Sequence, residues 1–573
     1  MAMLCTATLS SSVLPKSPSP AHLGSLQRQS QFITGPIGGV PYLKSARKGS
    51  SSSPSFTIRC LKGVAAPTAD ILSRLFNGGV TPTPIPDPTA VTRQDFPADF
   101  IFGAASSALQ TESSATEGGR GPSTWDSMLE GKDAVNSYNQ YPEDVQQLVK
   151  MGADAYRLSI SWTRILPDGT IAGGINQQGI DFYNKFIDEL VNNGITPIVT
   201  LFHFDLPTAL QTKYNGFLDT QILDDFKAYA DLCFKNFGDR VKYWVTVNEP
   251  QVFAQYGYKI GMNPPDPLPV TNPFVAAHNI ILAHATAAKL YKDTYQPTQK
   301  GEIGIPLVTQ WFEPYESGRP DDNAAKRAFD FLTGWFLEPL IYGDYPFIMK
   351  ALVGDNLPTF TDDQKALVKG SCDFIGVNYY TSSYAKDLPM LGPNDTITSQ
   401  ADFQRANLTS ANSQGVTIGP QAPGSPSIYV YPQGLRDALI YIGNNYGNPK
   451  IIVTENGYPE KRDDTIPVET AIQDDARIQH MIGHLYAISE AIKAGTNVKG
   501  YLMWALMDCM EVGSGYNVRF GLAYVDYLNN YKRTAKKSSG WLYSFLNAPA
   551  PAPKTKATLT PAPAPKRLKS VSV

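Results

Sequence analysis

Short apolar runs alternate with stretches of helical periodicity over most of the chain. The segment Thr196–Phe202 (TPIVTLF) is a compact apolar run of the kind found in buried strands. Residues 179–193 instead place their apolar side chains at the spacing of an amphipathic helix, and a second helix is expected near 219–237. Other strands are predicted at 155–162, 241–247, 303–308, 374–378, 451–454 and 500–505.

The repetition of strand and helix predicts a parallel sheet whose strands are joined by helices. Its length favours an α/β fold consisting of one closed (β/α)8 TIM barrel over an open sheet. In such barrels the active site lies at the carboxyl ends of the strands, where side chains distant in sequence converge.

Composition narrows the class of protein without identifying it. The 573 residues are 42% hydrophobic and 18% charged, which is enough apolar material for one large core. A net charge of -3 gives no excess of positive charge for nucleic acid or an acidic membrane surface. No run of 18 apolar residues occurs, so no membrane span is predicted.

The five cysteines form no C-x-x-C pair and no His/Cys cluster with zinc spacing. A disulfide framework is therefore not expected, and a reducing compartment is consistent with this usage. We expect the thiols of the globular part to be buried and free. The sequence implies neither a metal nor an organic cofactor.

The first 60 residues resemble an organelle leader. They are rich in Ser, contain several Lys and Arg, and the first acidic residue of the chain is Asp70. Because the apolar run of a secretory signal is missing, we predict a plastid (chloroplast) transit peptide over 1–60 that ends near Cys60. The alternative is an N-terminal tail without an address. Residues 61–95 are predicted to be a linker.

The predicted barrel domain covers residues 96–547. From 548 to 573 the chain alternates Pro and Ala, which cannot build a core and favours an extended tail.

The strongest chemical signals lie at the ends of two predicted strands. Glu249 stands in Thr246–Pro250 (TVNEP), and Glu455 stands in Val453–Gly457 (VTENG). Two carboxylates at the carboxyl ends of barrel strands suit glycoside hydrolysis, which needs one acid for the leaving oxygen and one carboxylate facing the anomeric carbon. Either Glu alone could be a helix cap, but the pair is harder to explain that way.

The two motifs resemble the T-x-N-E-P and T-E-N-G signatures of glycoside hydrolase family 1, the β-glucosidase family. The resemblance runs from Phe96 to Leu546 and includes further segments. These are Phe102–Ala104, Tyr156–Trp162, Gly376–Tyr380 and Arg519–Gly521. It implies a retaining mechanism through a covalent glycosyl-enzyme, with the two carboxyl groups about 5 Å apart.

The resemblance also implies a role for each carboxylate. Glu455 would attack the anomeric carbon, held by Arg157 and by a hydrogen bond from Tyr380. Glu249 would be the general acid/base, and the negative charge of Glu455 would raise its pKa. A bell-shaped pH profile with an optimum below neutrality is expected.

The remaining family positions predict the sugar subsite. Asn248 would contact the 2-hydroxyl group, Trp504 would stack under the ring, and Phe520 would close one wall. Core packing is the alternative role for Trp504 and Phe520. The predicted substrate-binding residues are Gln110, His203, Asn248, Asn378, Tyr380, Trp504, Glu511 and Phe520.

The chain departs from the family pattern at several positions. Ser113 ends the Q-x-E-G motif, Phe204 replaces the Trp of H-W-D, and Val512 replaces a Trp that normally contacts a sugar hydroxyl. Loss of that indole donor would cost about 1 kcal/mol of binding. Drift compensated by neighbouring residues is an equally strong explanation.

The aglycone slot is predicted to involve Tyr256 and Ser427. Many plant members carry Trp where Ser427 precedes Ile428–Pro432, and the segment 261–272 lacks a cysteine pair that many of them have. A missing indole widens the slot and removes a stacking surface. Bulky aglycones such as steroids are therefore expected over small flat ones.

Three functions are compatible with the family resemblance and the departures from it. They are a β-glucosidase acting on a plant defence glucoside, a transglycosidase of the same fold, and a lapsed enzyme kept for binding or assembly. The first two need the same carboxylates. Intact Glu249, Glu455, Arg157, Asn378 and Tyr380 weigh against the third. The chain is similar to grass plastid β-glucosidases acting on benzoxazinoid or steroidal saponin glucosides. That similarity implies a small glycoside as substrate and a homo-oligomer as an open possibility.

Overall fold

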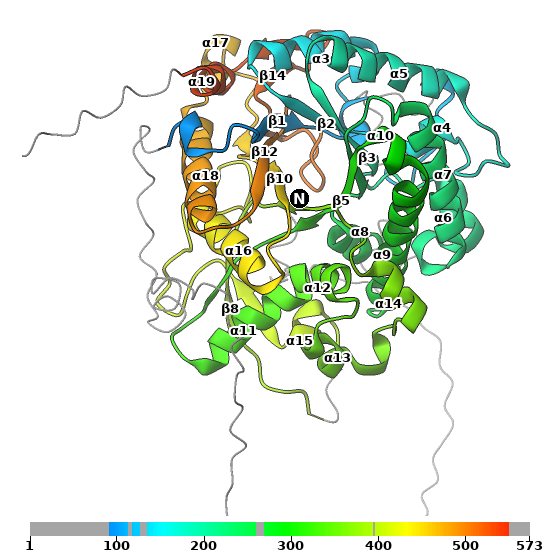
Figure 1. Ribbon diagram of the computed structural model, residues 1–573. Coiled ribbons are helices and arrows are strands. Elements are labelled where there is room, and N and C mark those ends of the chain that lie inside the picture. The colour runs from blue at the N-terminus through cyan, green and yellow to red at the C-terminus, as the bar shows by residue number, and fades with distance from the viewer. Residues whose placement is uncertain (1–90, 113–116, 127–133, 259–268, 393–395, 549–573) are drawn as a thin grey trace, which may run out of the picture. The chain divides into compact units, whose positions relative to one another are not determined.

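The computed structural model describes residues 91–112, 117–126, 134–258, 269–392 and 396–548. Eight parallel strands close into a barrel in the order β1-β12-β10-β7-β5-β4-β3-β2, which confirms the predicted TIM barrel (Figure 1). Their bounds are β1 Ile101–Ala105, β2 Ala155–Ser159, β3 Thr196–Phe202, β4 Tyr243–Val247, β5 Glu302–Val308, β7 Phe374–Asn378, β10 Ile451–Asn456 and β12 Val498–Trp504.

The strands are covered on their outer side by helices, as the ring of ribbons in Figure 1 shows. A strand buried on both faces explains why β3 reads as a continuous apolar run rather than an alternating one. The longer helices are α3 Ser137–Lys150, α5 Gln177–Asn192, α7 Gln221–Phe237, α9 Asn272–Leu290, α16 Pro432–Asn445, α18 Asp475–Lys493 and α19 Lys537–Leu546.

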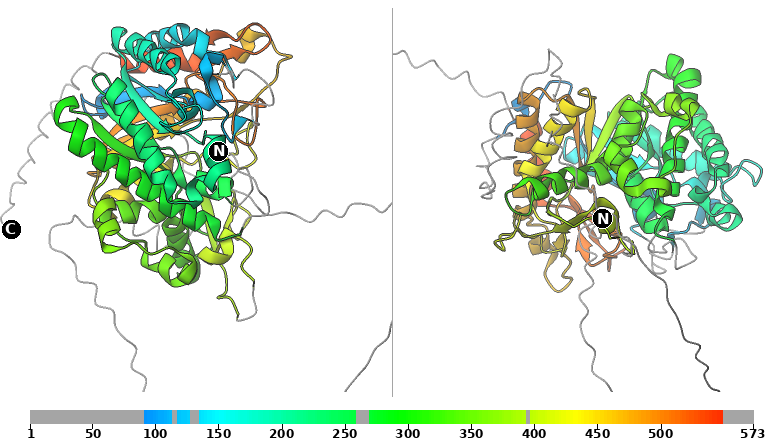
Figure 2. Two further views of the ribbon diagram at one scale, coloured as in Figure 1. Left: turned by 90° about the vertical axis from the view of Figure 1, so that its right-hand side faces the viewer. Right: turned by 90° about the horizontal axis from the view of Figure 1, so that it is seen from below.

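One region between β5 and β10 extends to one side of the barrel, at the bottom of Figure 1 and of the left view in Figure 2. It combines short helices with a three-stranded sheet in the order β6-β8-β9. Its elements are β6 Phe312–Pro314, α11 Arg319–Phe329, a π-helical turn Asp330–Gly334, α12 Trp335–Tyr342, α13 Phe347–Val353, α14 Asp362–Val368, β8 Ser383–Asp387, α15 Gln400–Gln404 and β9 Ala406–Thr409.

The strand β1, which pairs with β2 and β12, was not among the predicted strands. Its sequence IFGAA is short and has a central glycine, so periodicity alone does not reveal it. Gly103 is required by close packing, because a Cβ there would lie 2.1 Å from the carbonyl oxygen of Ala155. This strand pairing joins the first and last parts of the barrel.

The predicted strand at 155–162 is wrong at its carboxyl end. β2 stops at Ser159, and Trp162–Ile165 forms a helical turn, α4. The indole of Trp162 stacks on Tyr229 with ring centroids 4.9 Å apart and donates to the carbonyl of Gly169. This packing turns the chain away from the barrel wall.

The predicted transit peptide (1–60), most of the linker (61–95) and nearly all of the Pro/Ala tail (548–573) lie outside the described residues. So does most of the segment 261–272. Within the described residues no helix is long and apolar enough to cross a membrane. Cys233 and Cys509 are buried and free, as expected, and Cys372 is free and partly buried.

Candidate active site

Two strands bring Glu249 and Glu455 to the same end of the barrel. Glu455 belongs to β10, and Glu249 stands two residues beyond the end of β4. The relative exposure is 0% for Glu249 and 1% for Glu455, so both residues are buried. Glu249 has a φ of 43°, a left-handed conformation that is uncommon for a residue with a side chain and is often found at functional sites.

Glu455 is held from two directions. The Nη1 atom of Arg157 lies 2.6 Å from its Oε1 atom, and the hydroxyl of Tyr380 donates to its Oε2 atom at 2.9 Å. Both partners are the ones that the family resemblance implied. The carboxylate of Glu455 thus accepts one charge-assisted bond from a guanidinium and one bond from a phenol.

Arg157 is itself fixed in place by the barrel interior. Its Nε atom donates to the hydroxyl of Thr200 at 3.1 Å, and its Nη2 atom donates to Oδ1 of Asn248 at 2.7 Å. The Nδ2 atom of Asn248 lies 3.0 Å from Nε2 of His203. The predicted residues therefore form one hydrogen-bonded network.

Glu249 has a different environment. The Nδ2 atom of Asn378 donates to its Oε1 atom at 2.9 Å, while its Oε2 atom has no hydrogen-bond partner among the described residues. Burial raises the pKa of Glu249 well above its usual range, and the charge of Glu455 raises it further. Only the second of these causes could be predicted from the motifs. Burial is the larger one, and it follows from the barrel packing rather than from a motif.

Two residues of this network were not singled out from the sequence. The hydroxyl of Thr454 donates to Oδ1 of Asn378 at 2.6 Å, which turns the amide nitrogen of Asn378 toward Glu249. Thr200 supports Arg157 in the same way. Thr454 stands beside the nucleophile candidate in the T-E-N-G motif, but Thr200 lies in an apolar strand and carries no local signal.

The other predicted sugar-binding residues lie around the pair. The rings of His203 and Trp504 are stacked with centroids 5.7 Å apart, and the indole of Trp504 donates to Glu511 at 3.0 Å. Burial raises the pKa of Glu511 to about 7. Phe520 meets the ring of Tyr380 edge-on at 6.0 Å.

Both ends of the Gln110 side-chain amide are hydrogen-bonded within the protein. Its Nε2 atom donates to the carbonyl of Met510 at 2.7 Å, and its Oε1 atom accepts from Ser107 at 2.6 Å. His203 keeps a buried Nδ1 atom without a partner among the described residues. That atom and the free oxygen of Glu249 are polar groups left for a ligand to satisfy.

Of the departures from the family pattern, Phe204 and Val512 are buried, and Ser113 lies outside the described residues. Phe204 packs on Trp125 with ring centroids 4.9 Å apart and has a φ of 76°. Val512 is 7% exposed. Next to Phe204, neither carboxylate oxygen of Asp205 has a hydrogen-bond partner in the described part of the chain, and burial raises its pKa to about 6.

The two residues assigned to the aglycone slot are also buried. Tyr256 lies in α8 (Pro250–Tyr258), which follows Glu249, and Ser427 lies in the loop before α16, where its hydroxyl is 3.3 Å from that of Ser425. Their part in binding an aglycone stays a prediction.

A buried carboxylate pair at the carboxyl end of a (β/α)8 barrel, one partner bound to Arg and the other with a raised pKa, defines an O-glycosyl hydrolase. The sequence profile of the family described as "Glycosyl hydrolase family 1" matches residues 92–549. The chain belongs to glycosyl hydrolase family 1, and within that family it is a β-glucosidase.

Curated relatives agree with this assignment. The chain is 50% identical over 480 residues to beta-glucosidase 12 of Oryza sativa subsp. indica, covering 80% of this chain and 93% of that protein. It is 46% identical to furostanol glycoside 26-O-beta-glucosidase of Hellenia speciosa, over 81% of this chain and 85% of that protein. Raucaffricine-O-beta-D-glucosidase of Rauvolfia serpentina is 43% identical, over 80% and 92% of the two chains.

Solved structures show the same barrel. The rice β-glucosidase Os3BGlu6, solved as a mutant in a covalent complex with Glc from GA4GE, superposes with a TM-score of 0.77 at 41% identity. The match covers 80% of this chain and 99% of that chain.

Proposed function

We propose that the protein is a retaining β-glucosidase that hydrolyses a β-glucoside of plant specialised metabolism with a bulky aglycone, such as a steroidal saponin. The observation that carries the mechanism is the asymmetry of the pair, because Glu455 has Arg157 at 2.6 Å and Glu249 has a strongly raised pKa. One carboxyl group is thus prepared to attack as an anion and the other to donate a proton.

In the first step an Oε atom of Glu455 forms a bond to the anomeric carbon while the glycosidic C–O bond breaks. Glu249 gives its proton to the departing oxygen, and the aglycone leaves as a neutral alcohol. Formation of the ester removes the negative charge of Glu455, which favours ionisation of Glu249. Glu249 then takes a proton from water as the water oxygen attacks the anomeric carbon. The ester bond to Glu455 breaks, its carboxylate is restored, and β-glucose is released.

The aglycone assignment rests on Ser427 and on one relative of the chain. Ser427 stands where many plant members carry Trp, so one stacking surface for a flat ring is missing. A relative that is 46% identical is named for a furostanol glycoside, which is a bulky, non-planar substrate. A glucoside panel with steroidal, small aromatic and flat polycyclic aglycones tests this assignment.

We expect the highest kcat/KM for the steroidal glucoside and no turnover of any substrate by Glu455→Ala. A Ser427→Trp variant should gain activity on flat aglycones and lose it on steroidal ones. Fast turnover of small aromatic glucosides with steroidal saponins ignored would refute the aglycone proposal and leave the mechanism standing. Product analysis with an added alcohol acceptor separates hydrolysis from transglycosylation.

We also propose that residues 1–60 direct the protein to plastids, on the basis of their Ser-rich, acid-free composition. A fluorescent protein fused behind the full chain should enter chloroplasts of leaf cells, and a chain starting at residue 61 should stay in the cytosol. Fluorescence of the full-length fusion in the cytosol or the secretory pathway would contradict the proposal.

A further inference from the structure

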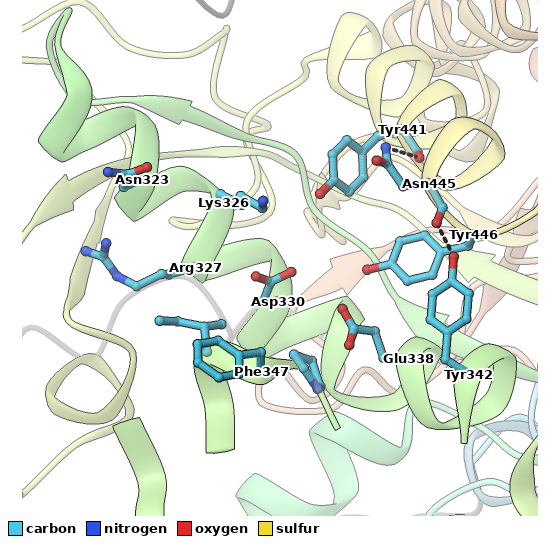
Figure 3. A pocket seen from close by; sticks show the side chains of 12 residues that line it. Asn323, Lys326, Arg327, Asp330, Glu338, Tyr342, Phe347, Tyr441, Asn445 and Tyr446 are labelled. Atoms are coloured by element: carbon cyan, nitrogen blue, oxygen red, sulfur yellow. Dashed lines mark hydrogen bonds between the residues drawn. The ribbon is translucent and has the colours of Figure 1, made fainter. Parts of the chain in front are cut away.

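A cavity lies outside the barrel, in the region between β5 and β10. Its volume is about 540 Å³, within the range of small-molecule binding sites. The cavity is lined by residues of α11, the π-helical turn Asp330–Gly334, α12, α13 and the carboxyl-terminal end of α16 (Figure 3). None of the residues assigned to glycoside hydrolysis lines it.

Two carboxylates point into this cavity from neighbouring helical turns, Asp330 from the π-helical turn and Glu338 from α12 (Figure 3). Asp330 is 8% exposed. The described part of the chain provides neither side chain with a hydrogen bond or with an ion pair within 4.0 Å, although more than nine-tenths of Asp330 is buried. Both carboxylates can therefore accept hydrogen bonds from a ligand in the cavity.

The pKa values of the two groups reflect the missing partner. Burial raises the pKa of Asp330 to about 6, against a weak opposing effect of Lys326. Burial also raises the pKa of Glu338 to about 7, and the charge of Asp330 and of Asp344 adds to this increase. Lys326 and Lys350 act in the opposite direction.

The cations around the cavity do not balance these carboxylates. Arg327 binds Asp387 at 2.5 Å and donates to the carbonyl of Gln404, and Lys350 binds Asp344 at 3.0 Å. Among the described cationic side chains that line the cavity, Lys326 is left to face both carboxylates. Two negative groups thus share one ammonium group, and one negative charge is left for a ligand when both are ionised.

Aromatic side chains form the remaining walls. Tyr342 and Tyr446 are stacked with ring centroids 5.9 Å apart, and Tyr441 meets Tyr446 edge-on at 6.4 Å. Phe347 stands at the rim with 80% of its surface exposed. Aromatic faces attract cations and offer apolar contact to a carbon skeleton.

We propose that this cavity is a binding site for an organic cation, with the ammonium or guanidinium group between Asp330 and Glu338 and the apolar body against Phe347 and the tyrosine rings. This site is independent of the glycosidase reaction. A neutral sugar would leave the excess negative charge unpaired, whereas a cation neutralises it and uses both the carboxylates and the rings.

Binding should depend on pH in a defined direction. Both carboxyl groups lose their protons between about pH 5 and pH 8. The other charged and titratable groups near them are Lys326, Lys350, Asp344 and the three tyrosines. The affinity for a cation should therefore increase at least tenfold from pH 5 to pH 8.

The test uses the full chain, titrated calorimetrically with agmatine and with phenethylamine at pH 5 and pH 8, and with 2-phenylethanol and glucose as neutral probes. We expect the two cations to bind at pH 8 and the neutral probes to bind at least tenfold more weakly. Binding of glucose in preference to the amines, equal binding of phenethylamine and 2-phenylethanol, or no binding of either cation at pH 8 would overturn the proposal.

Variants then locate the site. Asp330→Asn and Glu338→Gln should each weaken binding of the cations at least tenfold, and the exposed Asp363→Asn should leave it unchanged. Glu338→Lys places an ammonium group beside Asp330, so it should abolish binding and raise Tm at pH 8. All four variants should keep the kcat/KM of the wild type on a glucoside, which verifies folding. Unchanged binding of the cations by folded Asp330→Asn and Glu338→Gln would show that the site lies elsewhere.

Discussion

The amide of Asn378 sets the proton affinity of the proposed acid, and its removal gives a measurable shift. Its Nδ2 atom donates to Oε1 of Glu249 at 2.9 Å. This bond favours the ionised form of Glu249 and lowers its pKa against the effects of burial and of Glu455. In Asn378→Ala the opposing effects remain and the bond is lost, so the pKa of Glu249 should rise.

The size of the shift follows from the strength of one hydrogen bond to a charged group, about 1.5–3 kcal/mol. Since about 1.4 kcal/mol corresponds to one pKa unit, the basic limb of the pH profile should move upward by about one to two pH units. The measurement is kcat/KM against pH from 4 to 10, because this parameter reports groups of the free enzyme. Phenyl β-glucoside is the substrate, since its poor leaving group depends on the proton from Glu249.

Two further variants sharpen this test. Thr454→Val keeps the amide but removes the hydroxyl that orients it, so it should shift the same limb by a smaller amount in the same direction. Asn547→Ala removes an exposed amide far along the chain and should shift nothing. A basic limb that stays in place or moves to lower pH in folded Asn378→Ala, checked by circular dichroism, would refute the assignment of Glu249 as the acid.

Three other results are expected. Glu455→Ala should lose more than about 1,000-fold in kcat, and azide should restore turnover and give an α-glucosyl azide by chromatography; retained activity would disprove the nucleophile. The pKa of Glu249 is raised on folding, so above pH 4.5 the native protein holds one more proton than the unfolded chain and loses stability as the pH rises. The Tm of Glu249→Gln relative to the wild type should therefore increase from pH 4.5 upward. A Tm difference between the two proteins that stays constant with pH would contradict this. Asp508→Asn should lower the free energy of unfolding in urea by about 3–5 kcal/mol, because buried Asp508 binds Arg519 and Lys536, each at 2.8 Å; a loss below about 1 kcal/mol would exclude this role.

The barrel and the carboxylate pair could be predicted because each has a local signal. Runs such as Thr196–Phe202 match β3 residue for residue, and Glu249 and Glu455 each stand in a five-residue motif at a strand end. The strand around Gly103 carries too few apolar residues to be detected by periodicity. The strand prediction wrongly included Trp162. Its stacking partner, Tyr229, lies more than 60 residues later in the chain, so the local sequence gives no sign of this contact.

Properties that arise from packing could not be predicted from the sequence. The pKa of Glu249 depends first on its complete burial, which no motif records. The cavity around Asp330 is a stronger case, because its residues come from α11 to α13 and from α16, more than 90 residues apart, and form no pattern in the sequence. Functional residues that are neighbours in the sequence could be predicted. Those that only the fold brings together could not.

The network around the catalytic candidates explains why two similar carboxylates take different roles. Arg157 contacts Glu455 directly and reaches Glu249 only through the amides of Asn248 and Asn378. One buried cation cannot neutralise two buried anions, so the carboxyl group farther from it is the one that holds a proton. In the proposed mechanism the glycosyl ester would remove one of the two negative charges, so the same arrangement would allow Glu249 to ionise in the second step. Under that proposal the position of Arg157 on β2, rather than the two glutamates themselves, decides which carboxyl group is the nucleophile and which is the acid.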